Sequence, residues 1–160
     1  MNLLSSYRCR GTFTCKYLSF YDPKLKKPFR LPLVHIRIKH NGNTLRTDAL
    51  VDSGATGTFI PIELAEILEI EKPEKTEEAL GAGGTFPTYV TKIGEIEVLK
   101  GLSVFCRMQN YVVSIPTNPD AIPHCILGRD SIFWHNDITF RERRKHTIFR
   151  TSKSPTKQRH

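Results

Sequence analysis

The sequence predicts a mainly β protein built from antiparallel hairpins, with one or two short helices. Residues 33–39 alternate between apolar and polar side chains, which is the pattern of a strand with one buried face. Asn41 and Gly42 follow directly and form a strong signal for a tight hairpin turn. Residues 93–108 read as a second hairpin. Two hairpins of this kind make antiparallel pairing the main expected element of the fold.

The second hairpin is expected to have one buried and one solvated face. Ile96 and Val98 point inward in this interpretation, Glu95 and Glu97 point outward, and the turn lies at residues 100–101. The chain has 160 residues, of which 39% are hydrophobic. That length predicts one domain that can bury a core without disulfides.

The first hairpin leads the chain to Asp52. Its return strand, residues 44–51, is followed at once by Asp52 and then by a Ser53-Gly54 turn. The simpler explanation is an Asx turn, in which the aspartate binds its own backbone. The alternative is a functional carboxylate placed where the strand leaves the core, since a buried carboxylate is costly unless it is paired.

A short helix is expected after this turn, over residues 61–70. Pro61 suits a first helical position, and Leu64, Ile67 and Leu68 form an apolar stripe. Pro73 is expected to end the helix.

A second stretch, residues 125–133, repeats the arrangement around Asp52. Ile126, Leu127 and Gly128 mirror residues 50–52, because two apolar residues again end at a glycine turn. A short helix is expected to begin within residues 130–134. The preceding segment, residues 110–124, reads as an irregular surface loop.

The remaining C-terminal pattern is a final hairpin. Residues 138–140 and 147–149 are its expected strands, joined across a charged turn.

A glycine-rich segment lies between the two repeated stretches. Gly81, Gly83 and Gly84 precede a strand-like run, residues 85–90. No lysine follows at the spacing of a phosphate-binding loop, so nucleotide binding is disfavoured. Mobile glycines at a hairpin tip suit either a lid or an ordinary glycine-rich turn.

In this order, the motifs LVDSGAT, LGAGG and ILGRD resemble those of the retropepsins, the retroviral-type aspartic proteases, and most closely their single-domain cellular or microbial members. The resemblance covers residues 31–150. It implies a closed antiparallel β-barrel-like fold with half an active site per chain, and therefore a homodimer. It also implies a polypeptide substrate and no cofactor.

The resemblance assigns a role to each motif. Asp52 would be catalytic, with Ser53 and Gly54 supporting the active site. The residues that would contact substrate are Gly54, Ala55, Gly83 and Gly84. The residues that would form a structural second loop are Ile126, Leu127, Gly128, Arg129 and Asp130.

One position departs from the family pattern. Retroviral enzymes commonly have an aspartate two residues after the motif glycine, where it pairs with the later arginine, but this chain has Thr56. Arg129 therefore lacks its expected partner. Asp130, Glu63, another acidic residue or a terminal strand of a neighbouring subunit could take that place.

The charge divides the chain into three parts. Residues 1–40 carry a net +8, residues 41–140 carry −7, and residues 141–160 carry +7. Because the family resemblance covers residues 31–150, we separate an N-terminal basic and aromatic extension (1–30) from the protease-like domain (31–150) and a disordered basic tail (151–160).

The two basic terminal segments suggest an alternative function. A non-catalytic module with the same fold could use them to bind an acidic partner or nucleic acid. Nucleic acid is the less favoured partner, because residues 1–30 show no recognition motif and read more simply as an edge strand or a dimer contact.

The other residues that could bind metals or form crosslinks show no functional spacing. The four cysteines form no CxxC pair and the six histidines are scattered, so we expect reduced cysteines and no metal. No apolar stretch reaches the length of a membrane span, and the N-terminus lacks the apolar core of a secretory signal. The expected location is the cytoplasm.

Overall fold

The computed structural model describes residues 6–81 and 83–152, and it confirms a mainly β fold with two short α-helices. The strands are β1 (Ser6–Cys9), β2 (Thr12–Lys16), β3 (Leu18–Asp22), β4 (Lys27–Leu31), β5 (Leu33–His40), β6 (Asn43–Val51), β7 (Glu77–Gly81), β8 (Gly84–Lys100), β9 (Ser103–Pro116), β10 (Cys125–Leu127), β11 (Asn136–Arg141) and β12 (His146–Thr151). The α-helices are α1 (Ile62–Ile67) and α2 (Ile132–His135), and a 3-10 turn, η1 (Glu142–Arg144), joins β11 to β12.

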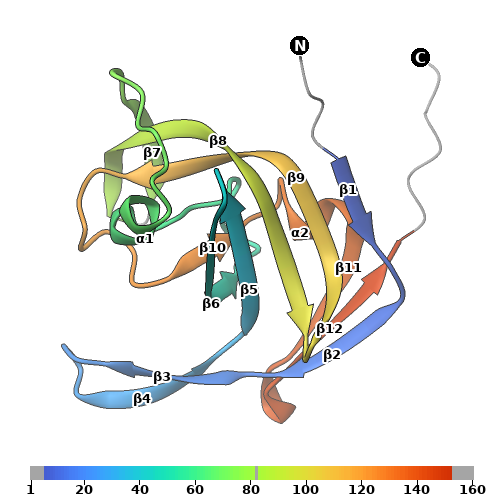
Figure 1. Cartoon of the computed structure of the whole chain (residues 1–160). Helices are drawn as coiled ribbons and strands as arrows, with labels where there is room; N and C mark the ends of the chain where they lie inside the picture. Colours follow the sequence, from blue (N-terminus) through green and yellow to red (C-terminus); the bar gives the residue numbers. More distant parts are fainter. Residues whose placement is uncertain (1–5, 82, 153–160) are drawn as a thin grey trace, which may run out of the picture.

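Three sheets make up the fold (Figure 1). The largest has the order β1-β9-β8-β5-β6-β10, and β7 pairs with β8 beside this path. A second sheet has the order β11-β12-β2, and β3 pairs with β4 as a separate two-stranded sheet. Among the described strands, each pair is antiparallel except β6 with β10.

One apolar core joins the two larger sheets. Phe13 of β2, Phe105 of β9 and Phe149 of β12 are buried together, with ring centroids 5.4 to 5.9 Å apart. The N-terminal segment, set apart in the sequence by its charge, therefore contributes β2 to the same core as the rest of the chain. The tail from residue 153 onward lies outside the described residues.

The hairpin that leads to Asp52 forms as the sequence predicts. Asn41 and Gly42 both have positive φ, 47° and 85°, as the tight turns that match strand twist require. β5 and β6 pair along their length, from His40 with Asn43 to Leu33 with Leu50. The final hairpin, β11 to β12, is confirmed as well.

Helix α1 is shorter than predicted. It ends at Ile67, six residues before Pro73, because Glu69 adopts a left-handed conformation with φ of 53°. Its apolar stripe is also placed differently: Ala65 and Leu68 are buried, whereas Ile67 is 61% exposed.

The prediction for residues 110–124 is wrong in its first half. β9 continues to Pro116, and Tyr111, Val113 and Ile115 are buried along it. The irregular loop is residues 117–124, and it leads directly into β10.

The prediction that Glu97 points outward as a solvated residue is also wrong. Its side chain is 0% exposed, because Arg37 of β5 and Arg107 of β9 lie directly opposite it on the two neighbouring strands. Arg37, Arg107 and Lys39 all donate hydrogen bonds to its carboxylate, at 2.5 to 3.2 Å. Burial acts to raise the pKa of Glu97, and these hydrogen bonds outweigh it, lowering the pKa to about 2.

The expectation of reduced cysteines is wrong for one pair. Cys9 and Cys106 form a disulfide, because the pairing of β1 with β9 places them directly opposite each other. Cys15 and Cys125 are free thiols.

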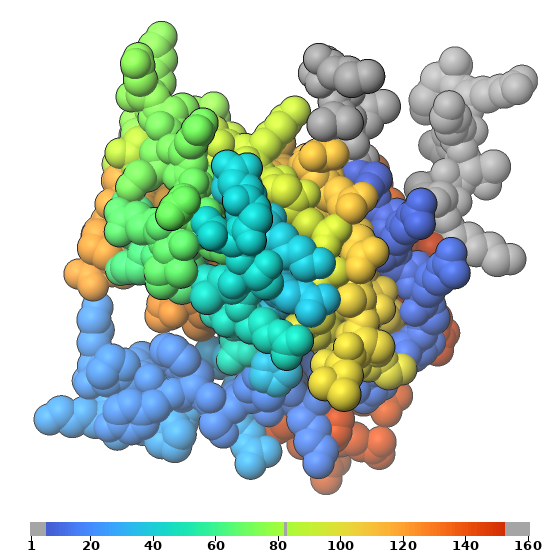
Figure 2. Space-filling model, viewed as in Figure 1, coloured from blue at the N-terminus to red at the C-terminus, as the bar shows by residue number. Residues whose placement is uncertain are grey.

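The β3–β4 hairpin, which we call the arm (residues 18–31), stands apart from the sheets. It extends from the lower edge of the molecule in Figure 1 and forms a separate projection in the space-filling view (Figure 2). Tyr21 and Leu25 near its tip are 59% and 61% exposed.

Candidate active site

Asp52 lies where two parallel strands end. β10 pairs with β6 so that Ile126 lies opposite Leu50 and Leu127 opposite Val51. The N–H of Asp52 donates to the Leu127 carbonyl at 3.1 Å, which fixes the aspartate backbone against the end of β10. The mirrored arrangement of the two stretches is therefore a real pairing of strands.

The turn after Asp52 holds its carboxylate from one side. The N–H of Gly54 donates to Oδ1 of Asp52 at 2.8 Å, and the N–H of Ala55 donates to the Asp52 carbonyl at 3.3 Å. This is the Asx turn that the sequence allowed as the simpler explanation. Within the described residues, Oδ2 accepts no hydrogen bond, so the turn orients the carboxylate and leaves one oxygen available.

Close packing against the second loop supports this turn. A Cβ on Gly128 would lie 2.1 Å from the Gly57 carbonyl oxygen and 2.8 Å from that of Ala55, so only glycine fits there. The N–H of Arg129 donates to the Ala55 carbonyl at 2.9 Å, and the N–H of Asp130 donates to the Thr56 carbonyl at 3.0 Å. The second loop thus acts as a backbone scaffold for the Asp52 turn.

Two residues that the sequence did not single out complete this scaffold. The Thr58 hydroxyl donates to Oδ1 of Asp130 at 3.1 Å, and the Tyr7 hydroxyl of β1 donates to the Asp130 carbonyl at 2.8 Å. Partial burial of its carboxyl raises the pKa of Asp130, and the hydroxyl groups of Tyr111 and Thr58 oppose this. Thr58 could have been noticed as a polar residue in an apolar run, but the contact of Tyr7 depends on long-range pairing.

Ser53 and Arg129 are exposed beside Asp52. Across residues 6–81 and 83–152, no ion pair involves Arg129, and the Ser53 hydroxyl has no hydrogen-bond partner. The pairing of Arg129 with Asp130 or Glu63 that the sequence left open is therefore not found. Both side chains remain available for groups outside this chain.

The glycine-rich segment forms a hairpin between β7 and β8. Gly81 pairs with Gly84, which has φ of 109°, and Gly83 lies in the turn between them; Ala82 is outside the described residues. The ring of Phe86 lies 6.3 Å from that of Phe59, which follows the Asp52 turn. The glycine hairpin therefore packs through Phe86 against the segment that holds the site.

Neither metal ligands nor a membrane span can be identified in the part of the chain that the structure describes. No group of three or more His, Cys, Asp or Glu side chains there is arranged to hold a metal ion. None of the described helices has the length and apolar character to cross a membrane.

Comparison with known proteins gives a consistent result. A family model described as aspartyl protease matches residues 35–131. A retropepsin-like aspartic protease from Rickettsia conorii has a similar solved structure, with a TM-score of 0.58 and 13% sequence identity over 92% of this chain and 94% of that one. No curated protein matches the chain. The solved structure supports the fold, and the family model spans the Asp52 turn and the second loop.

Proposed function

Because the chain belongs to the aspartyl protease family, we propose that it is a homodimeric endopeptidase with Asp52 from each subunit in one active site. The observation that carries the proposal is the residue beside Asp52. β10 runs parallel to β6, and the position level with Asp52 is Gly128. The strand beside Asp52 therefore supplies no second carboxylate, and a second copy of the chain is the simplest source of one.

The chemistry follows from two carboxylates at a two-fold axis. Two adjacent carboxyl groups share one proton, so one acts as a base while the other acts as an acid. The base takes a proton from a water as its oxygen attacks the carbonyl carbon of the peptide bond, and the acid gives its proton to the carbonyl oxygen. The resulting diol then breaks the C–N bond as the amine leaves with a proton.

The surrounding groups have matching proposed roles. Ser53, whose hydroxyl has no partner in the described part of the chain, would bind across the dimer, and Arg129 would pair with a group of the other subunit. Gly54 and Ala55 would contact the substrate backbone. The glycine hairpin, with Gly83 and Gly84 at its tip, would close over the peptide as a flap.

The proposal is tested with the Asp52→Asn variant. This change removes the acid–base group but keeps the side-chain shape, so we expect kcat/KM on a mixed peptide library to fall by about 10³-fold or more. Asp137→Asn, an exposed aspartate of β11, is the matched control and should keep full activity. An Asp52→Asn protein that cleaves as well as the wild type would contradict the proposal.

Subunit mixing tests the shared site. Wild-type and Asp52→Asn chains are unfolded together in equal amounts and refolded, so that they combine at random. If each active site needs two copies of Asp52, only the wild-type homodimer is active. Activity then falls to about a quarter of that of a pure wild-type sample with the same total protein. Retention of about half of the activity would show that each chain acts alone.

A further inference from the structure

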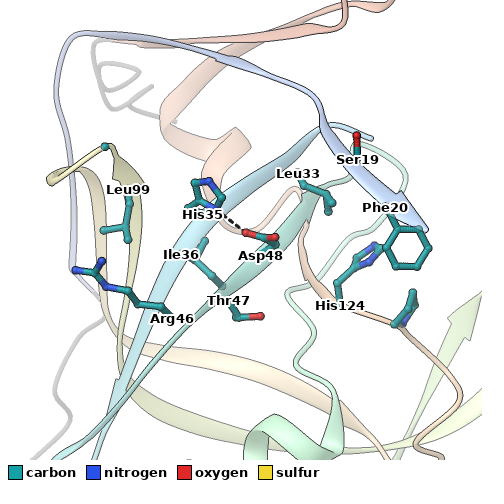
Figure 3. A pocket seen from close by; sticks show the side chains of 12 residues that line it. Ser19, Phe20, Leu33, His35, Ile36, Arg46, Thr47, Asp48, Leu99 and His124 are labelled. Atoms are coloured by element: carbon teal, nitrogen blue, oxygen red, sulfur yellow. Dashed lines mark hydrogen bonds and ion pairs between the residues drawn. The ribbon is translucent and has the colours of Figure 1, made fainter. Parts of the chain in front are cut away.

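A cavity of about 560 Å³ lies between the arm and the outer face of the β5–β6 hairpin. Phe20 of the arm lines it, together with Leu33 and His35 of β5 and Arg46 and Asp48 of β6. Figure 3 shows Phe20 beside His124, a residue of the loop that leads into β10. We call this space the arm cavity.

Two of the three β6 residues that line the arm cavity, Arg46 and Asp48, are on the face of the strand that leads to Asp52. Successive side chains of a strand alternate between its faces, so Arg46, Asp48 and Leu50 share a face that leads to Asp52. The opposite face of the strand, with Ala49 and Val51, is buried in the core. With a rise of about 3.3 Å per residue, Asp48 and Arg46 lie roughly 13 and 20 Å from Asp52 along this face. An extended peptide covers these distances in about four to six residues.

The charges around the arm cavity favour an acidic occupant. Oδ1 of Asp48 lies within hydrogen-bond distance of Nδ1 of His35, at 2.6 Å (Figure 3). Arg46 lines the cavity, and no ion pair involves it anywhere in residues 6–81 and 83–152. The guanidinium is thus an unmatched positive charge at the cavity wall.

The arm adds to this positive charge. Its basic residues are Lys24, Lys26, Lys27 and Arg30. Asp22, the acidic residue of the arm, accepts hydrogen bonds from the backbone N–H groups of Lys24 and Leu25, so it is engaged in the arm's own turn. Like charges at the tip would repel a basic segment and attract an acidic one.

The rest of the cavity wall is apolar or uncharged. The rings of Phe20 and His124 meet edge to face, with centroids 5.3 Å apart. Burial lowers the pKa of His124, and Asp48 opposes this, so the ring favours its neutral form. Leu33 adds an apolar surface. The site therefore suits a side chain with an alkyl stem and a terminal carboxylate.

We propose that the arm cavity is a specificity subsite that receives an acidic side chain of the polypeptide substrate, about four to six residues from the cleaved bond. The proposal rests on the proposed endopeptidase function. It assigns the acid-binding role to Arg46, with the basic arm attracting the same segment.

The test uses a peptide that the enzyme cleaves, found with a mixed library. Glutamate or its uncharged analogue glutamine is placed four, five or six residues from the cleaved bond, on either side, which gives twelve peptides. Each subunit of the proposed dimer carries one arm cavity, so for at least one position on either side we expect kcat/KM to be about fivefold higher with glutamate than with glutamine, since the carboxylate gains an exposed ion pair. Equal values for all six pairs of peptides would overturn the proposal.

The Arg46→Gln variant identifies the group responsible. Arg46 is exposed, so the change should leave folding intact, and we expect it to remove the preference for glutamate without affecting the glutamine peptide. Arg143→Gln, at an exposed position of η1, is the matched control and should keep the preference. A preference that persists in Arg46→Gln would overturn the assignment. These outcomes are separate from those that test the proposed endopeptidase activity, which fails if no peptide is cleaved through Asp52.

Discussion

Asp52 and Glu97 are two carboxylates on neighbouring parts of the largest sheet, and their surroundings are opposite. Glu97 lies in the middle of three strands, fully buried, with hydrogen bonds from Arg37, Lys39 and Arg107. Asp52 lies at the end of a strand, half-buried, with one backbone N–H, from Gly54, on its carboxylate.

The difference separates a structural carboxylate from one suited to chemistry. Each oxygen of Glu97 is satisfied by hydrogen bonds, so a substrate has no access to it and the carboxylate stays ionised near neutral pH. Asp52 is oriented by a rigid backbone turn but keeps an oxygen without a partner in the described residues. Supporting an acid through main-chain packing, as the second loop does, fixes its position without neutralising its charge.

The largest effect on folding is expected where that packing is tightest. In Gly128→Ala, the new Cβ would overlap the carbonyl oxygens of Gly57 and Ala55, and the two loops would have to separate. We expect a loss of about 4 kcal/mol in the free energy of unfolding, at the upper end of overpacking effects, together with loss of activity. Urea unfolding measures the first quantity. Gly83→Ala is the control for stability, because its Cβ meets no atom within 4 Å; equal stability of the two variants would contradict the packing argument.

Glu97→Gln should affect stability but not catalysis. The pKa of Glu97, about 2 in the folded protein, lies below its ordinary value, so the ionised carboxylate stabilises the fold above about pH 4.5 and this contribution disappears as the pH falls to about 2. We expect the variant to lose about 3 kcal/mol of unfolding free energy at pH 7, and the deficit to shrink with acidification.

Thermal unfolding between pH 7 and pH 2 checks this prediction, with the exposed residue Glu63 changed to Gln as the control. A deficit that is independent of pH would mean that the carboxylate charge is not what stabilises this region. The kcat of the folded variant should equal that of the wild type.

Gly54→Ala should affect catalysis but not stability. The added Cβ would lie 3.2 Å from Oδ1 of Asp52, so the carboxylate must shift by a few tenths of an ångström while the fold is retained. We expect kcat to fall about tenfold with little change in unfolding free energy. Gly57→Ala is the control from the same turn, because its Cβ would make only ordinary contacts, at 3.7 and 3.9 Å. Equal kcat values for the two variants would show that the turn does not fix the carboxylate.

The smallest effect is expected from Thr58→Val. This change keeps the buried shape and removes the hydroxyl that donates to Asp130, which should cost about 1 kcal/mol at neutral pH. The bond favours the ionised form of Asp130, whose pKa burial has raised, so the cost should decrease when acid protonates this carboxyl. Chemical unfolding at two pH values measures this loss of unfolding free energy, and Thr139→Val, at an exposed position, is the control. A cost that does not change with pH would argue against this bond.

Local sequence patterns were enough to predict the hairpin and the strand end that position Asp52. Asn41 and Gly42 indicate their turn because few other residues accept positive φ at both positions. The apolar pairs before Asp52 and Gly128 indicate two equivalent strand ends, and the register of β6 with β10 confirms that equivalence. These features depend on neighbouring residues, so the sequence displays them directly.

Features that depend on distant register could not be predicted in this way. Glu97 alternates as an outward residue should, and its burial follows only from Arg37 and Arg107 lying opposite it on two other strands. Cys9 and Cys106 are 97 positions apart, and no spacing rule connects them. The hydrogen bond from Tyr7 to the second loop likewise requires β1 to be placed against β9.

The pairing of β10 with β6 has a consequence for the order in which the protein is assembled. It joins Ala49 to Cys125, 76 positions apart, and the β7, β8 and β9 strands must be made between them. A contact with so large a sequence separation forms late, because a long loop has to close before the contact can stabilise it. During synthesis, Asp52 therefore leaves the ribosome long before its support does. We expect the nascent chain to remain without a formed active site until residues 125–130 have been translated.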